Sequence, residues 1–154
     1  MLRNADASDA SAISATLREA FTEFEALYTP AAFQATTPAA DQIQARMAEG
    51  PVWVAERDGQ VVGTVSAVPR GEELYIRSMA VRPAARGEGI AARLLHAVES
   101  FATAGQYHRL VLTTTPFLTA ALQLYQREGF RHTGERSDLY GTTLLTMAKE
   151  LGGA

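Results

Sequence analysis

With 154 residues, 47% of them hydrophobic, the chain is long enough to bury the core of one globular domain, which we expect to span residues 1–154. The net charge of −3 gives no electrostatic case for nucleic-acid binding, and the absence of cysteine excludes disulfides, thiolate metal sites and a cysteine nucleophile. The sequence contains neither an apolar run of membrane-spanning length nor a signal-peptide pattern, so we expect no membrane association and a cytoplasmic location.

The first third of the chain predicts one short strand and two helices. Leu2–Asn4 indicates the strand, and apolar residues at helical spacing, among them Ile13 and Leu17, indicate the first helix. The segment 25–40 contains two prolines and is expected to be an irregular connection. A second helix over 41–49 ends at a Gly-Pro pair.

The middle of the chain predicts three consecutive strands. A hairpin joins the strand 52–56 to the strand 61–68 through Asp58-Gly59. A further turn leads to an apolar strand over 74–81, which ends before Pro83 because proline has no N–H for the ladder.

The last part of the chain alternates helices and strands. Apolar positions from Ile90 onward predict a long amphipathic helix, followed by a strand at 109–112, a helix at 119–128 and strands starting near 130 and 142. The predicted order is βααβββαβαββ, which indicates an α/β or α+β fold with a mixed sheet.

A glycine-rich loop links the apolar strand to the long helix. Gly87 and Gly89 have no Cβ, so a phosphate can approach the backbone, and the unpaired N–H groups of the helix N-terminus attract anions. Arg86 adds a charged donor. The loop therefore predicts a phosphate or pyrophosphate site, although the same glycines would also suit a plain strand–turn–helix connection.

The segment 87–92 also matches the G-x-G-x-x-A pattern of dinucleotide-binding domains. That pattern requires glycines directly after a strand and an acidic residue at the end of the next strand. Here an arm containing Pro83 intervenes, and the next strand runs into Thr113-Thr114-Thr115. This alternative is therefore weak.

A second resemblance fits better. Arg86-x-x-Gly89-x-Ala91 resembles the R/Q-x-x-G-x-G/A motif of the GNAT N-acetyltransferase superfamily, and the segments 79–83 and 124–130 resemble that family in the same order and at the same spacing. The resemblance, closest to small bacterial-type members, implies a central twisted sheet splayed between its fourth and fifth strands. By the same resemblance, acyl-CoA is expected to lie in that splay.

The resemblance also implies a set of cofactor-binding residues. The strand edge is expected to hold the pantetheine arm and the thioester through backbone groups, and the loop is expected to hold the pyrophosphate. Glu88 departs from the basic residue often found at its position, so it must point to solvent. The residues implied are Met79, Ala80 and Val81 on the strand, with Arg86, Gly87, Glu88, Gly89, Ile90, Ala91 and Ala92 in the loop and first helical turn.

Tyr125 is the catalytic candidate, because the family places a tyrosine here to donate a proton to the departing thiolate. A phenol, with a reference pKa near 10, stays protonated at neutral pH. The alternative is a core tyrosine, since Leu118, Ala121 and Leu122 share its helical face. Leu118 also replaces an asparagine that often contacts the cofactor in the family.

The acceptor side is less well defined. Phe24, Glu25 and Tyr28 fall in the connection that covers the acceptor pocket in relatives, and Tyr75 replaces a glutamate found in some of them. No general base is assigned. The three histidines are too scattered for a metal site, so no metal is expected.

The implied function is acetyl transfer from acetyl-CoA to a primary amine of a small molecule or peptide, by direct attack in a ternary complex. The alternative is a non-catalytic acyl-CoA-binding sensor of the same fold. Family habit also allows a homodimer. The sequence names neither the acceptor nor the preferred acyl length.

Overall fold

A computed structural model describes residues 1–152; the last two residues of the expected domain lie outside this range. Its regular elements alternate along the chain as the hydrophobic pattern predicts, apart from one additional helix. The strands are β1 (Leu2–Asn4), β2 (Val52–Arg57), β3 (Gln60–Arg70), β4 (Glu73–Val81), β5 (Arg109–Thr114), β6 (Arg131–Leu139) and β7 (Thr142–Glu150). The helices are α1 (Ala10–Phe21), α2 (Pro30–Thr36), α3 (Ala40–Arg46), α4 (Ile90–Ala104) and α5 (Thr119–Arg127), with 3₁₀ turns at Ala7–Asp9, Thr22–Leu27 and Pro83–Ala85.

One seven-stranded sheet in the order β1-β2-β3-β4-β5-β7-β6 organises the fold. Strands β4 and β5 are parallel, and every other neighbouring pair is antiparallel. This mixed α/β sheet confirms the predicted fold class. It does not suit the dinucleotide-binding alternative, which needs a mostly parallel sheet.

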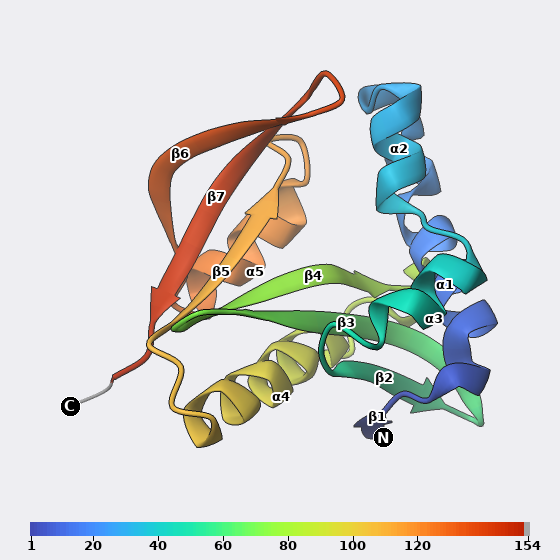
Figure 1. Ribbon diagram of the computed structural model, residues 1–154. Coiled ribbons are helices and arrows are strands. Elements are labelled where there is room, and N and C mark those ends of the chain that lie inside the picture. The colour runs from blue at the N-terminus through green and yellow to red at the C-terminus, as the bar shows by residue number, and fades with distance from the viewer. Residues whose placement is uncertain (153–154) are drawn as a thin grey trace.

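The sheet opens between β4 and β5, as the family resemblance implied. Their pairing covers only Glu73–Ile76 of β4 against Arg109–Leu112 of β5. Beyond these residues the two strands diverge, and Figure 1 shows β5 rising away from β4 toward β6 and β7. The second half of β4 therefore has a neighbouring strand on one side only.

A β-bulge accompanies this divergence. Thr64 of β3 pairs with Ala80, whereas Ser66 pairs with Arg77, so β4 carries one additional residue between these two pairs. Ser78 lies in this interval with a φ of 58°, a left-handed conformation that is uncommon outside glycine. A bulge bends its strand and strengthens the local twist, which fits the departure of β4 from β5.

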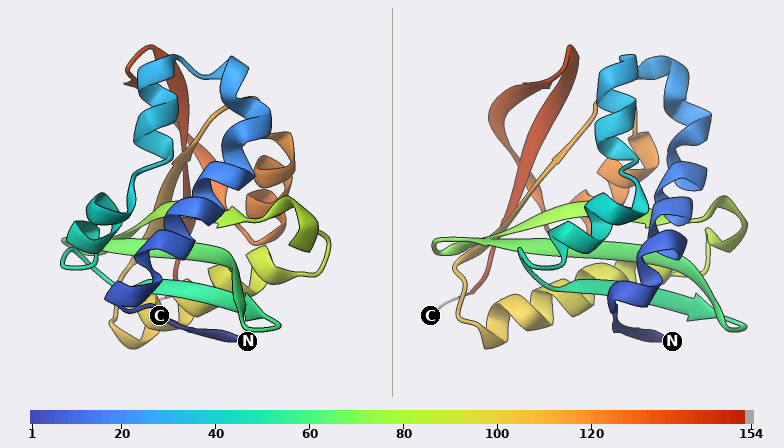
Figure 2. Two further views of the ribbon diagram at one scale, coloured as in Figure 1. Left: turned by 90° about the vertical axis from the view of Figure 1, so that its right-hand side faces the viewer. Right: turned by 45° about the vertical axis from the view of Figure 1, so that its right-hand side comes forward.

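Helices cover both faces of the first half of the sheet. Strand residues alternate between the faces, so buried Trp53 packs with Leu94 and Val98 of α4, whereas neighbouring Val54 packs with Leu17 of α1. Figure 2 shows α4 on one side of β2–β4, with α1 and α3 on the other. The two clusters place the N-terminus of α4 and the C-terminus of α1 near the open part of the sheet.

Helix α2 corrects the expectation of an irregular connection over 25–40, and it makes the order βαααβββαβαββ. Pro30 was interpreted as a breaker, but it occupies the first turn of the helix, where its missing N–H costs nothing. Thr29 is the N-cap, and its hydroxyl accepts a hydrogen bond of 3.2 Å from the backbone N–H of Ala32.

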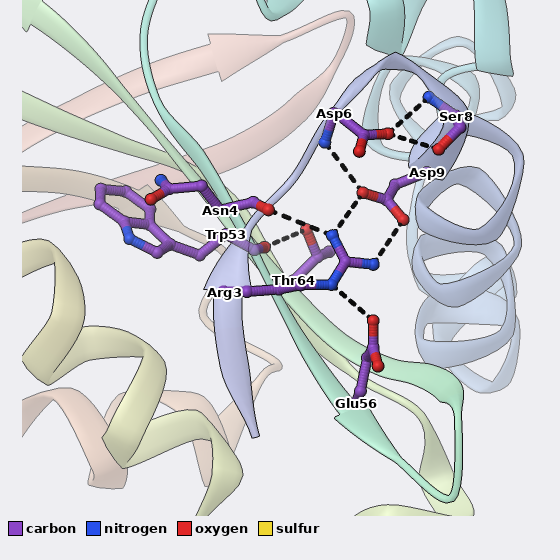
Figure 3. Close-up of polar contacts among 8 residues, drawn as sticks. All are labelled: Arg3, Asn4, Asp6, Ser8, Asp9, Trp53, Glu56 and Thr64. Atoms are coloured by element: carbon purple, nitrogen blue, oxygen red, sulfur yellow. Dashed lines mark hydrogen bonds and ion pairs between the residues drawn. The ribbon is translucent and has the colours of Figure 1, made fainter.

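A charged cluster fixes the start of α1 to the edge of the sheet (Figure 3). Arg3 of β1 donates two hydrogen bonds of 2.8 Å to the carboxylate of Asp9 and one of 2.5 Å to Glu56 of β2. Asp9 is buried and also accepts from the backbone N–H of Asp6 at 2.9 Å. The paired guanidinium of Arg3 lowers the pKa of the Asp9 carboxyl, although burial acts in the opposite direction.

This cluster predicts a pH-dependent contribution to stability. Because folding lowers the pKa of Asp9, its contribution is present above the ordinary carboxyl pKa and is lost as the pH falls through the folded-state value. We expect Asp9→Asn to lower the urea midpoint at pH 7, with the difference from wild type shrinking steadily below pH about 4. A difference that stays constant down to pH about 2 would show that Asp9 acts only through packing.

Candidate active site

A cavity of about 610 Å³ lies in the opening between β4 and β5. Its walls come from the second half of β4, the end of β5, the loop before α4, and α5. The end of α1, the Thr22–Leu27 turn, α2 and α3 also contribute, together with Leu139 of β6 and Leu144 of β7. Segments far apart in the sequence therefore meet at the point where the sheet opens.

The edge of β4 forms one wall through its backbone. Met79, Ala80 and Val81 line the cavity and lie beyond the last residue that pairs with β5. Their backbone groups on that side have no neighbouring strand to bind, yet backbone polar groups need partners. A ligand with amide groups can supply these partners in the manner of an added strand.

The glycine loop forms a second wall. Gly87 and Gly89 have φ values of 81° and 78°, and Gly89 is the N-cap of α4. A Cβ built on either glycine would meet no other protein atom within 4 Å, so the space beside them is open. The first residues of α4, Ile90, Ala91 and Ala92, also line the cavity. This combination of open space and unpaired helix N–H groups fits a phosphate.

Two buried tyrosines also line the cavity. Tyr125 of α5 and Tyr28, which precedes α2, are each 7% exposed and line the cavity. The Tyr125 ring contacts Phe130 at 5.8 Å between centroids, and the Tyr28 ring contacts Phe117 at 4.9 Å. Burial raises the pKa of Tyr28 to about 12. Burial, and secondarily the nearby Tyr28, raises the pKa of Tyr125, so both phenols remain hydrogen-bond donors at neutral pH.

The charged side chains that line the cavity are all arginines. They are Arg46 of α3, Arg77 of β4, Arg86 of the loop and Arg127 of α5. Within residues 1–152, no aspartate or glutamate contributes to the lining. The cavity is therefore electropositive and offers donors rather than a carboxylate base.

Comparison with known proteins identifies the family of this fold. Residues 15–130 match the family model described as "Acetyltransferase (GNAT) family". The chain belongs to the acetyltransferase (GNAT) family.

Individual GNAT relatives support the same assignment. N-acetylaspartate synthetase of Danio rerio is 43% identical over 88 residues, a match that covers 56% of this chain but only 31% of that protein. A ribosomal-protein-alanine N-acetyltransferase structure from Brucella melitensis is 28% identical, with a TM-score of 0.77 over 98% of this chain and 99% of that one. A GNAT structure from Elizabethkingia anophelis with acetyl-CoA bound is 26% identical, with a TM-score of 0.62 over 74% and 84% of the two chains.

The residues that the GNAT resemblance assigns to the cofactor are largely brought together. The three β4 residues line the cavity, as do all loop and helix residues of the set except Glu88. Glu88 forms an ion pair with Arg57 at the surface instead. Arg86 lines the cavity, but its guanidinium is engaged, binding the Glu23 carboxylate and donating a 3.0 Å hydrogen bond to the Ala20 carbonyl.

On the acceptor side, the structure brings together three of the four candidate residues. Phe24, Tyr28 and Tyr75 line the cavity, and the hydroxyls of Tyr75 and Thr113 share a hydrogen bond of 2.8 Å. Glu25 is exposed and does not belong to the lining.

The sequence analysis missed Arg46, Arg77 and Arg127. A usable signal existed for Arg77, because Arg77-Ser78 interrupts an otherwise apolar strand, and a polar residue at a buried position is informative. Arg46 and Arg127 carry no such signal, since each closes an amphipathic helix with an ordinary basic residue.

Two absences complete the description of the site. Residues 1–152 contain no group of three or more histidine, cysteine or acidic side chains placed to hold a metal ion. In the same part of the chain, no helix combines the length and apolar character needed to cross a bilayer.

The loop geometry predicts a selective effect of Gly89→Ala. The variant places a Cβ in the space where a phosphate would lie, so we expect CoA affinity to fall by about 10-fold or more, measured by calorimetry. Gly71→Ala is a matched control, because Gly71 has a φ of 62° and equally open surroundings in the turn between β3 and β4, at the other end of β4 from the loop. Equal CoA affinity in the two variants would remove the loop from the binding site.

Arg86 predicts a ligand-dependent effect. If its guanidinium binds the pyrophosphate, we expect Arg86→Ala to weaken CoA by about 10- to 100-fold while leaving pantetheine, which lacks the pyrophosphate, nearly unaffected. Glu23→Gln removes the present partner of Arg86 and is expected to tighten CoA binding. Equal losses for CoA and pantetheine in Arg86→Ala would assign Arg86 a structural role.

Proposed function

We propose that this GNAT protein is an acetyl-CoA-dependent N-acetyltransferase that acts on a primary amine by direct attack in a ternary complex. The observation that carries this proposal is the open edge of β4, which lies in one cavity with the glycine loop and two protonated phenols. Bound acetyl-CoA would supply an acetyl group activated as a thioester. The same cavity extends past this edge to the side covered by Phe24 and Tyr28, which leaves room for the acceptor.

The proposed role of β4 is to hold the donor through its backbone. Met79, Ala80 and Val81 offer N–H and C=O groups that β5 does not use. An N–H aimed at the thioester carbonyl would stabilise the negative charge that develops on its oxygen, as in an oxyanion hole. The loop from Arg86 to Ala92 would hold the pyrophosphate through backbone N–H groups and the helix dipole.

The amine must be neutral before it can attack. The described lining offers no carboxylate to remove its proton, and Glu72 and Glu73 lie at the far end of β4 beside His108 and Arg109. The four arginines disfavour a further positive charge in the cavity and therefore lower the pKa of a bound ammonium group. We propose that the electropositive lining promotes loss of this proton to water, without a dedicated base.

The proposed role of Tyr125 is to donate a hydrogen bond to the sulfur as the thiolate departs. Its raised pKa keeps the phenol protonated, and it also makes complete transfer of the proton to sulfur less favourable. The phenol therefore acts chiefly by stabilising the negative charge that develops on sulfur. The proton that finally resides on sulfur is the one that the attacking nitrogen loses as the amide forms, which is distinct from the ammonium proton lost earlier to water.

The names of the relatives indicate an amine acceptor in each case and differ in its identity. One is named for N-acetylaspartate and another for an alanine of a ribosomal protein. These names support N-acetylation as the reaction and do not select an acceptor for this chain. A cytoplasmic location, a homodimer and a single domain over residues 1–154 remain proposals, and no observation favours the non-catalytic sensor.

The proposed mechanism predicts that Tyr125→Phe lowers kcat by about 100-fold with little effect on CoA affinity. Phenylalanine keeps the ring and its contact with Phe130, so the melting temperature is expected to change little. Acyl donors whose leaving thiol has a low pKa should restore much of the lost rate, because such a thiolate departs without help. The measurement is thiol release at saturating substrates with donors of graded leaving-group pKa.

Two further variants give the controls. Tyr107→Phe removes a phenol from a half-buried tyrosine packed on Phe101 outside the cavity, and it is expected to leave kcat unchanged. Tyr28→Phe tests the second cavity phenol. A loss that depends on leaving-group pKa in Tyr28→Phe but not in Tyr125→Phe would transfer the donor role to Tyr28.

A further inference from the structure

Two arginines lie close together in the wall of the cavity. Arg46 ends α3, and Arg77 precedes the bulge of β4. Both line the cavity and both are only partly exposed. Neither belongs to the phosphate-binding wall, which is built from the loop that follows β4.

The protein neutralises this pair incompletely. The Nη2 atom of Arg77 lies 3.3 Å from a carboxylate oxygen of Glu49, and its Nε atom is buried without a hydrogen-bond partner in the described chain. Arg46 makes a 3.3 Å hydrogen bond to the uncharged hydroxyl of Ser78. The Glu49 side chain is 50% exposed and is the one carboxylate of residues 1–152 that pairs with either arginine.

The electrostatics agree with this geometry. Burial lowers the pKa of Arg46, the positive charge of Arg77 lowers it further, and Glu49 acts in the opposite direction. Two cations withdrawn from water beside one half-exposed anion are costly. A bound anion would satisfy the unpartnered donor and relieve the repulsion between the two guanidinium groups.

We propose that the acceptor amine carries a carboxylate group, as a free amino acid does, and that Arg46 and Arg77 bind this carboxylate. The proposal rests on the N-acetyltransferase function proposed above. Planar guanidinium groups match a carboxylate in geometry and remain charged at every physiological pH. Arg77 and Ser78, the hydrogen-bond partner of Arg46, directly precede Met79, so a carboxylate held by the two arginines lies beside the backbone edge of Met79–Val81 and the amine of the same acceptor can face the donor.

A bound carboxylate also affects which amines can enter the cavity. A carboxylate at Arg46 and Arg77 offsets part of the repulsion that an ammonium ion would meet on entering an electropositive cavity, while Arg86 and Arg127 still disfavour the ammonium form. An amine without an anionic group meets that repulsion in full. The site thus selects an amine by its accompanying negative charge.

The test uses the full chain and compares acceptors that differ only in whether they carry a carboxylate. A panel of L-amino acids and the corresponding L-amino acid amides is supplied with acetyl-CoA, and thiol release is followed. The amide loses its amine proton more readily than the amino acid, so a preference for the carboxylate cannot arise from amine reactivity. We expect kcat/KM to favour the preferred amino acid over its amide by about 10- to 100-fold, the range for a lost charge-assisted contact.

Variants of the two arginines test whether they cause the preference for an amino acid over its amide. Arg77→Gln and Arg46→Gln are expected to remove most of the difference between amino acid and amide, chiefly by raising KM for the amino acid. Arg109→Gln is the matched control, because Arg109 is also half-buried on the sheet and paired with glutamates, but does not line the cavity. It is expected to preserve the preference. Equal losses for amino acid and amide in Arg77→Gln and Arg46→Gln, or a wild type without preference, would overturn the proposal.

A binding measurement separates this inference from the proposed function. Calorimetric titration of the CoA-bound protein with the same amino acids and amides requires no turnover. If no amine is acetylated but amino acids bind and Arg77→Gln abolishes this binding, the transferase function fails and the carboxylate site stands. If amines are acetylated and carboxylates neither bind nor react preferentially, the function stands and the carboxylate site is refuted.

Discussion

The divergence of β4 from β5 is the constraint on which the rest of the molecule depends. Backbone N–H and C=O groups are costly to leave without partners, and a sheet normally satisfies them on both sides of a central strand. Beyond Ile76 this is no longer possible for β4. The bulge at Ser78 accommodates the divergence at the cost of a left-handed backbone conformation. The fold thus lacks β4–β5 hydrogen bonds beyond Ile76, and the backbone groups left unpaired there face a cavity.

The cavity has a consistent electrostatic character. Its charged groups are arginines, its buried phenols have raised pKa values, and its helix N-terminus carries a positive dipole. All three features favour negative charge, either on a bound molecule or developing during a reaction. Such a site stabilises negative charge most strongly when water is excluded, because electrostatic interactions strengthen as the local dielectric falls.

Sequence patterns predicted the central strand–loop–helix unit because its signals are local. Pro83, Gly87 and Gly89 set the loop, and apolar spacing sets the helix that follows. Helix α2 was missed because proline disfavours a helix interior but suits its first turn, and the distinction depends on where the helix begins.

The acceptor end of the site was less accessible to sequence reasoning. Arg46 and Arg77 are 31 positions apart, and only the packing of α3 over the bulged strand brings them to one cavity. Their proximity is a tertiary property without a local motif. Tyr125 was found through its family motif, but the depth of its burial follows from contacts with residues of other elements. Spacing within a helix indicates the buried face and leaves the neighbours on that face undetermined.

The ion pair between Arg86 and Glu23 connects two walls of the cavity. Arg86 belongs to the wall proposed to face the donor, whereas Glu23 lies in the 3₁₀ turn whose next residue, Phe24, lines the side proposed for the acceptor. An anion that binds Arg86 competes with Glu23 and loosens the tether of this turn, so filling one end changes the freedom of the other. By thermodynamic reciprocity, an acceptor that orders the turn must alter donor affinity by the same factor. The donor and the acceptor proposed for this site would then be coupled through a single side-chain contact, and the free energy of that contact limits how strongly one can change the affinity of the other.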